Sequence, residues 1–200
     1  MLDNQKSRNI AAKIVDPVAK GLLRIGLTAN AVTVIGASLS SVIALLTIPY
    51  GNFQLALALM IPLVAADLLD GTMARISNSV SKKGAFLDSV MDRLTDISLL
   101  AAYILWSIST ENSVLTYILL LGLAESAVIP YIRAKAESIG IECKVGVLER
   151  GERILLIGIA TILAALNLGS YVVWVFAIFA LLGFITVLQR IFAVLKSVEL

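Results

Sequence analysis

The stretch that decides the fold class is YVVWVFAIFALLGFITVLQRIFAV, residues 171–194. It is long enough to cross the hydrocarbon core of a bilayer, which takes about 20 apolar residues in a helix. Five further apolar runs precede it, over residues 31–50, 53–69, 85–108, 114–132 and 154–166. These runs are continuous, whereas the strands of a membrane barrel alternate between apolar and polar residues. The sequence therefore predicts an all-α, polytopic membrane protein with six transmembrane helices.

The composition supports this fold class and excludes several kinds of chemistry. Hydrophobic residues make up 59% of the chain and charged residues only 15%, and the net charge of +2 does not indicate a nucleic-acid partner. There is no histidine and only one cysteine, Cys143. A Ser-His-Asp triad, a histidine base, an internal disulfide and a cysteine-rich zinc site are therefore excluded, which leaves carboxylates, lysine and arginine.

The placement of basic residues predicts the topology. All 16 Lys and Arg residues lie before the first apolar run, in or beside the two longer connections, or near the C-terminal end. The three short connections between runs carry none. By the positive-inside rule, both termini and the two long loops are expected in the cytoplasm, and the protein in the inner (plasma) membrane.

The N-terminal segment, residues 1–28, has apolar residues near helical spacing with charges between them. This pattern predicts an amphipathic helix on the cytoplasmic membrane surface, and a disordered basic tail is the alternative. The segment has no separate apolar block and does not resemble a signal peptide. We expect one domain over residues 1–200, with the six-helix bundle over residues 31–195.

Four aspartates lie where the second and third apolar runs meet a charged connection. Asp67 and Asp70 are three residues apart, and Asp88 and Asp92 are four apart, so each pair projects from one face of a helix. Four like charges at the edge of a low-dielectric slab require protonation or bound cations. Oxygen ligands without histidine or thiolate suit Mg²⁺, Mn²⁺ or Ca²⁺, and several carboxylates suit a two-metal centre. Alternatively, single aspartates could pair with Arg75 or complement a helix dipole.

Small residues beside the aspartates indicate an anion site. Gly71 and Gly84 permit close approach of a backbone, and Arg75 offers a planar fork to a phosphate. A second basic group, formed by Arg133, Arg153 and Arg190 with their neighbours, fits a phosphorylated acceptor. These arginines could alternatively serve only to anchor helix ends.

The residues around the aspartates resemble the signature of the CDP-alcohol phosphatidyltransferase family. The matching positions are Asp67, Asp70, Gly71, Ala74, Arg75, Gly84, Asp88 and Asp92. The resemblance implies that the four aspartates bind two metal ions, expected to be Mg²⁺ with Mn²⁺ possible, and that Asp92 is also the catalytic proton acceptor. It further implies transfer of a phosphatidyl group from CDP-diacylglycerol to an alcohol, with release of CMP, in phospholipid biosynthesis.

Nearly the whole chain is similar to one branch of that family, the actinobacterial phosphatidylinositol phosphate synthases. This similarity implies inositol 1-phosphate as the acceptor, with Arg133, Arg153 and Arg190 binding its phosphate, and it implies a homodimer. It also assigns the CDP-lipid to a set of residues near the aspartates, namely Asn30, Ala31, Val32, Thr33, Gly71, Arg75 and Ser81.

Two alternatives remain at this point. Glycerol 3-phosphate could be the acceptor, which would give phosphatidylglycerol phosphate. An ion-coupled transporter would also carry carboxylates within its helices, and Glu125 in the fourth apolar run favours it. Glu125 otherwise fits a buried helix contact, hydrogen-bonded or protonated.

Overall fold

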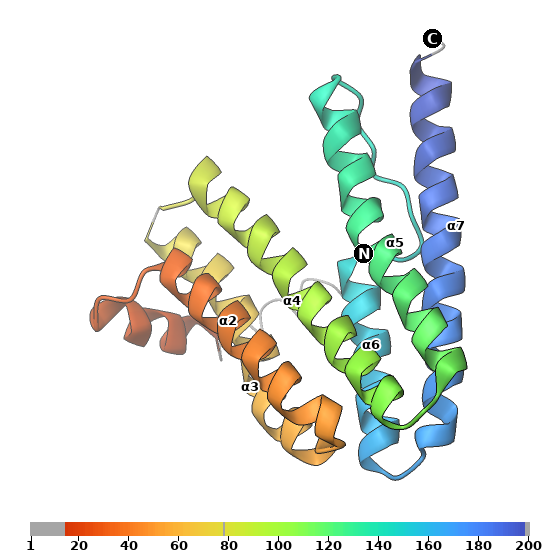
Figure 1. Cartoon of the computed structure of the whole chain (residues 1–200). Helices are drawn as coiled ribbons and strands as arrows, with labels where there is room; N and C mark the ends of the chain where they lie inside the picture. The colour runs from red at the N-terminus through yellow and green to blue at the C-terminus, as the bar shows by residue number, and fades with distance from the viewer. Residues whose placement is uncertain (1–14, 78, 199–200) are drawn as a thin grey trace, which may run out of the picture. The chain divides into compact units, whose positions relative to one another are not determined.

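The protein is helical throughout the part that the structure describes. The computed structural model describes residues 15–77 and 79–198, without the side chains of residues 64–68. Residues 15–24 are helical, and no strand occurs within these ranges. Six longer helices follow (Figure 1), namely α2 (Ala29–Thr47), α3 (Phe53–Ile76), α4 (Lys82–Ser109), α5 (Ser113–Ser138), α6 (Arg150–Ala165) and α7 (Val172–Val198). The all-α prediction is therefore confirmed.

Each predicted apolar run coincides with one long helix to within a few residues, except where the helix continues past the run. The largest extensions are in α3, which continues from Leu69 to Ile76, and in α5, which continues from Ile132 to Ser138. Within the described ranges, three segments are long and apolar enough to cross a membrane, namely Ala29–Tyr50, Ser113–Ser138 and Gly169–Val198. The membrane character is thus confirmed, whereas six spans stay a prediction.

The chain divides into two compact units. Unit 1 contains Met1–Ile43 and Ala58–Thr95, and unit 2 contains Ala44–Leu57 and Asp96–Leu200. Helices α2, α3 and α4 each contribute residues to both units. The four aspartates of the signature belong to unit 1, and the three arginines of the predicted acceptor site belong to unit 2.

In unit 1, the helix over residues 15–24 ends in a tight turn that returns the chain to α2. Gly26 has φ +87°, which favours glycine, and the amides of Gly26 and Leu27 donate to the carbonyls of Leu23 and Leu22. The apolar side of this helix packs on α2 and α3 in a small core of Ala19, Ala29 and Met73. Contact of this helix with the membrane surface stays a prediction.

Unit 2 has an aromatic core between α3, α4 and α7. The ring of Phe53, at the start of α3, meets Trp106 of α4 edge-on with centroids 5.0 Å apart. Tyr103 of α4 meets Phe176 of α7 at 4.8 Å. Helix α7 also packs along α5 and α6, and Figure 1 shows α5 and α7 side by side.

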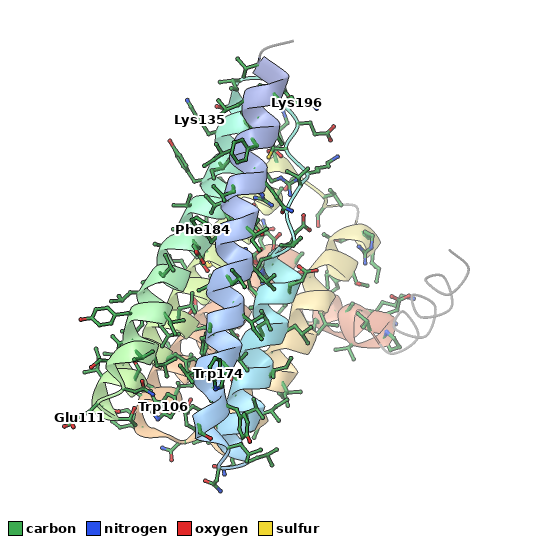
Figure 2. All side chains as sticks on the ribbon, turned by 90° about the vertical axis from the view of Figure 1, so that its right-hand side faces the viewer. Trp106, Glu111, Lys135, Trp174, Phe184 and Lys196 are labelled. Carbon is green, nitrogen blue, oxygen red and sulfur yellow. The ribbon has the colours of Figure 1, made fainter. Side chains whose placement is uncertain are left out.

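At one end of unit 2 the described residues include no Lys or Arg, and the opposite end is basic. At the first end, Gln54 Nε2 donates to the carbonyl of Ala165, and Ser109 Oγ donates to that of Pro49, so the three short connections meet there. Figure 2 shows Trp106 and Trp174 towards this end and Lys135 and Lys196 towards the opposite end. The segregation of basic residues in the sequence is thus reproduced in the fold.

Candidate active site

Thr28 starts α2 and so positions the predicted CDP-lipid residues Asn30–Thr33. Its hydroxyl accepts a hydrogen bond from the amide of Ala31 at 3.2 Å, and its carbonyl accepts one from the amide of Val32 at 3.1 Å. Threonine is a favoured residue at a helix N-cap because its side chain satisfies an amide that has no partner within the helix. The cap therefore uses the amides of Ala31 and Val32. Asn30 and Thr33 lie in the same part of α2, directly after Thr28.

Thr33 connects α2 to the aspartates of α3. Its Oγ1 donates a hydrogen bond to Oδ2 of Asp70 over 2.6 Å, and the hydroxyl also lies 3.1 Å from the carbonyl of Ala29 in the preceding turn. A hydroxyl–carboxylate bond of this length is charge-assisted and strong. It holds Oδ2 of Asp70 in a fixed direction.

Asn30 connects α2 to the beginning of α4. A β-carbon added to Gly84 would lie 3.1 Å from Oδ1 of Asn30 and 3.4 Å from Oγ of Ser81. Ser81 also starts α4, because its hydroxyl accepts from the amide of Gly84 and its carbonyl from that of Ala85. The glycine of the signature thus allows the two helix starts to approach closely, as the sequence predicts.

Arg75 lies in the last turn of α3 and is exposed. Its Nη2 donates to Oγ1 of Thr72 over 2.9 Å, and its Nη1 would lie 3.8 Å from a β-carbon on Gly71. The guanidinium therefore lies along the side of α3 that carries Gly71. A substituent larger than hydrogen at position 71 would restrict access to it.

The two aspartates of α4 differ in exposure. Asp88 is exposed, and Asp92, one turn further along, is only 9% exposed. The side chain of Asp67 lies outside the described residues, as does any contact it makes. Among the side chains that are described, no three acidic or cysteine residues lie close enough together to hold a metal ion. The predicted four-carboxylate centre therefore stays a prediction.

The described part of this site fits a divalent cation of the hard type. Thr33 holds Asp70, Asp92 is buried, and the group contains only oxygen ligands. Carboxylate ligands without histidine or thiolate match the ligand preference of Mg²⁺ and Mn²⁺.

In unit 2, Arg153 is a buried residue in the first turn of α6. Its Nη2 donates to Oδ2 of Asp96 over 2.7 Å, and the two side chains are 3% and 2% exposed. The contact uses one oxygen of the carboxylate. Asp96 Oδ1 and Arg153 Nε are both buried and have no hydrogen-bond partner within the described residues.

Arg190 of α7 is 4% exposed and holds two backbone carbonyls. Its Nε donates to Val145 over 2.9 Å, and its Nη1 donates to Ile129 over 2.7 Å. The amide of Leu148 donates to Thr186, one turn before Arg190. Arg190 therefore attaches the loop between α5 and α6 to α7.

Arg133, near the end of α5, is the exposed member of the arginine group. Its Nε forms an ion pair with Glu137 over 2.9 Å, at a spacing of one helical turn. Arg133 and Arg153 are both near enough to Arg190 for their charges to act on it. The structure thus brings the three predicted arginines into one region of unit 2.

Sequence reasoning missed Asp96, which has the most buried carboxylate of this region. The signal was present, because Asp88, Asp92 and Asp96 follow one another at intervals of four residues along one face of α4. The partner of Asp96 lies 57 residues away, and no local pattern indicates that distance.

The described fold is that of a helical membrane protein, and known proteins share this fold. The sequence model of the family described as CDP-alcohol phosphatidyltransferase matches residues 26–187. The chain belongs to the CDP-alcohol phosphatidyltransferase family, and it is accordingly an enzyme and an integral membrane protein. This result favours an enzyme over the ion-coupled transporter.

The curated relatives are phosphatidylinositol phosphate synthases. The protein of Mycobacterium marinum is 37% identical over 152 residues, which cover 76% of this chain and 65%, slightly under two thirds, of the relative. The protein of Cutibacterium acnes is 35% identical over 201 residues, which cover 94% of this chain and 95% of the relative.

Solved structures of the phosphatidylinositol phosphate synthase of Mycobacterium tuberculosis share the fold. The structure with CDP-DAG bound has a TM-score of 0.86 and 31% identity, and the match covers 92% of this chain and 94% of that one. The structure in complex with manganese and citrate has a TM-score of 0.83 at 31% identity, covering 89% and 87%.

Proposed function

We propose that the chain transfers the phosphatidyl group of CDP-diacylglycerol to inositol 1-phosphate, forming phosphatidylinositol phosphate and CMP. The observation that carries this proposal is that α2 contacts both helices of the signature, with Thr33 on Asp70 of α3 and Asn30 against Gly84 of α4. The relatives support the choice of reaction, because similarity to the Cutibacterium acnes synthase extends over nearly the whole chain.

In this proposal the carboxylates of Asp67, Asp70, Asp88 and Asp92 hold two divalent cations, Mg²⁺ or Mn²⁺. The manganese complex of the Mycobacterium tuberculosis protein supports a divalent ion. Bound cations would supply the positive charge that stabilises the transferring phosphoryl group and the departing CMP. Thr33 fixes the direction of one Asp70 oxygen, and the burial of Asp92 excludes water from its carboxylate.

The donor binds to residues at the start of α2, near the end of α3 and at the start of α4. Asn30–Thr33 and Ser81 lie at two helix starts, where amide dipoles favour an anion, and Arg75 beside Gly71 supplies a positive charge for the diphosphate. The structure with CDP-DAG bound in the Mycobacterium tuberculosis relative supports this donor.

The chemical step follows from these roles. The acceptor hydroxyl attacks the phosphorus atom attached to diacylglycerol, and its proton passes to the carboxylate of Asp92. A new phosphorus–oxygen bond forms to the acceptor as the bond to CMP breaks, and CMP leaves with the electron pair. The step neither oxidises nor reduces any atom.

The phosphate of the acceptor would bind to Arg133, Arg153 and Arg190. The charges of Arg133 and Arg153 act on Arg190, and an anion of two negative charges would offset this repulsion. Arg190 has two of its donors on backbone carbonyls, which restricts its guanidinium to one orientation. Pre-organised donors bind an anion more tightly than mobile ones because less conformational entropy is lost.

For the membrane topology, we propose six spans in the plasma membrane with both termini in the cytoplasm, and an N-terminal helix that also contacts the membrane surface. In support of this, Lys135 and Lys196 lie at the basic end of unit 2, and Trp174 lies at the opposite end. Tyr117 lines a pocket with Glu111 at that opposite end, and Tyr117 and Trp174 are both exposed. Aromatic residues of this kind are enriched where lipid meets water. A homodimer stays a prediction, which crosslinking in membranes would test.

The test is release of CMP by purified protein in detergent, with CDP-diacylglycerol and each of three acceptors. We expect turnover with inositol 1-phosphate, little with glycerol 3-phosphate or myo-inositol, and none after removal of divalent cations by a chelator until Mg²⁺ or Mn²⁺ is restored. Preferred turnover of glycerol 3-phosphate would overturn the acceptor, and turnover in the chelator would overturn the metal centre.

A further inference from the structure

The ion pair of Asp96 and Arg153 is buried and incompletely hydrogen-bonded. Nη2 of Arg153 and Oδ2 of Asp96 are 2.7 Å apart, but Nε and Oδ1 have no partner within the described residues. Nε and Nη2 form one edge of a guanidinium and commonly bind a carboxylate together. Here the carboxylate of Asp96 accepts a hydrogen bond from Nη2 and none from Nε. A buried N–H without a partner requires an explanation, such as a ligand.

Holding α4 against α6 does not explain the pair. Tyr103 of α4 and Thr161 of α6 already connect these helices through a buried hydrogen bond of 2.8 Å. A buried ion pair also contributes little net stability, because desolvation of both charges offsets their attraction, and apolar residues of similar volume often do as well. A reason specific to the charge of Arg153 is therefore needed.

Arg153 without Asp96 would be a lone buried cation. Both side chains are almost completely inaccessible, and Arg133 and Arg190 add positive charge nearby. Asp96 compensates the charge and, through its one short bond, sets the rotation of the guanidinium plane. Nε keeps its donor capacity in that orientation.

We infer that Asp96 is a positioning residue, which holds Arg153 in the orientation that binds the phosphate of the acceptor. The inference rests on the proposed function, since it assigns Arg153 to the acceptor and not to the CDP-lipid. Asp96 itself does not touch the substrate, and it acts through Arg153.

The test is a double-mutant cycle on the full-length enzyme with inositol 1-phosphate and CDP-diacylglycerol. Asp96→Asn should raise the KM for inositol 1-phosphate about tenfold, because a hydrogen bond to a charged group is lost or weakened. The KM for CDP-diacylglycerol should stay within about twofold, since that site has other ligands. In an Arg153→Ala background, Asp96→Asn should cause no further rise in the KM for inositol 1-phosphate.

A matched control separates positioning from general loosening of the helix pair. Tyr103→Phe removes the other polar contact between α4 and α6, and it should lower the unfolding temperature without changing the KM for inositol 1-phosphate. If Tyr103→Phe raises that KM as much as Asp96→Asn does, Asp96 has only a structural role. If Asp96→Asn does not yield folded protein, Asp96→Glu keeps the charge and displaces the guanidinium, and the same rise in KM is expected.

The outcomes distinguish this inference from the proposed function. An unchanged KM for inositol 1-phosphate in Asp96→Asn, or an equal rise with and without Arg153, overturns the positioning role alone. An unchanged KM in Arg153→Ala overturns the assignment of Arg153 to the acceptor, and hence the proposed acceptor site.

Discussion

At the residue scale, Asp92 combines burial with a position in the family signature. Its side chain is 9% exposed, whereas Asp88, one turn earlier, is exposed. A carboxylate shielded from water takes a proton from a substrate hydroxyl more readily than a solvated one does. We therefore assign the proton transfer to Asp92 and expect Asp88 to act only as a metal ligand.

We expect Asp92→Asn to lower kcat by about a thousandfold, because general base catalysis commonly contributes up to about four orders of magnitude. The amide is nearly the same size as the carboxyl, so the unfolding temperature and CDP-diacylglycerol binding should change little. CMP release measures kcat. Thermal unfolding measures the unfolding temperature, and equilibrium binding measures the affinity for CDP-diacylglycerol. Turnover at the normal rate would show that Asp92 is not the general base.

Thr33 has a contact that gives it a second role besides the predicted CDP-lipid contact. Its hydroxyl donates to Asp70 over 2.6 Å, so it orients a predicted metal ligand. We expect Thr33→Val, which replaces the hydroxyl by a methyl group, to raise the Mg²⁺ concentration for half-maximal activity by about tenfold. Titration of activity against Mg²⁺ measures this change.

Thr33→Ser is the control, since it keeps the hydroxyl and should leave the Mg²⁺ requirement near that of the unmodified protein. If the valine and serine variants behave alike, the bond to Asp70 does not support the metal site. A rise only in the KM for CDP-diacylglycerol would assign Thr33 to the donor alone.

At the element scale, α5 and α7 pack closely because Gly183, which has no side chain, faces the carboxyl group of Glu125. A β-carbon at Gly183 would overlap the carboxyl group of Glu125, which is 5% exposed and lacks a hydrogen-bond partner within the described residues. Small residues commonly allow such approach between membrane helices. Glu125 therefore belongs to a helix contact, in agreement with one of the two interpretations of the sequence.

We expect Gly183→Ala to destabilise the protein by about 1–3 kcal/mol, because a methyl group would be forced into an occupied position. The double variant Gly183→Ala with Glu125→Ala should recover much of this loss. Gly158→Ala is the matched control on α6, where a β-carbon would meet no atom within 4 Å, and its effect should be small. Thermal unfolding in detergent measures all three, and equal losses at positions 183 and 158 would contradict this account.

At the scale of the whole molecule, the prediction concerns orientation in the membrane. In a background without Cys143, Ser170→Cys is expected to react with a membrane-impermeant maleimide in intact cells, because it lies at the end of unit 2 that lacks Lys and Arg. Lys144→Cys, an exposed position in the basic loop, should react only after the cells are permeabilised. The opposite pattern would reverse the topology.

Much of the architecture was predictable because its determinants are local. Apolar runs of about 17 residues or more indicate membrane helices wherever they occur. Each of the six predicted runs coincides with a helix, including the shorter one over residues 154–166. The boundaries were less accurate. Helix α3 continues through the polar residues after Leu69, since a helix backbone does not end where side chains become polar.

The candidate site was predictable in its residues and not in its contacts. The spacing of Asp67, Asp70, Asp88 and Asp92 on helices, together with the family signature, indicated the four carboxylates. The sequence contains no sign that Thr33 reaches Asp70 across 37 positions or that Asp96 pairs with Arg153 across 57. Such pairs depend on which helix faces lie against each other, and that choice results from packing of the whole chain.

By itself, the sequence determined that this chain is a helical membrane protein with basic residues confined to alternate connections, because hydropathy and charge act segment by segment, and it predicted a carboxylate centre. Only the tertiary structure decided that Asp96 compensates the charge of Arg153, that Arg190 holds the loop before α6, and that Gly183 lies against the carboxyl group of Glu125. Burial and hydrogen-bond direction are properties of folded neighbours, and a linear pattern of residues does not contain them.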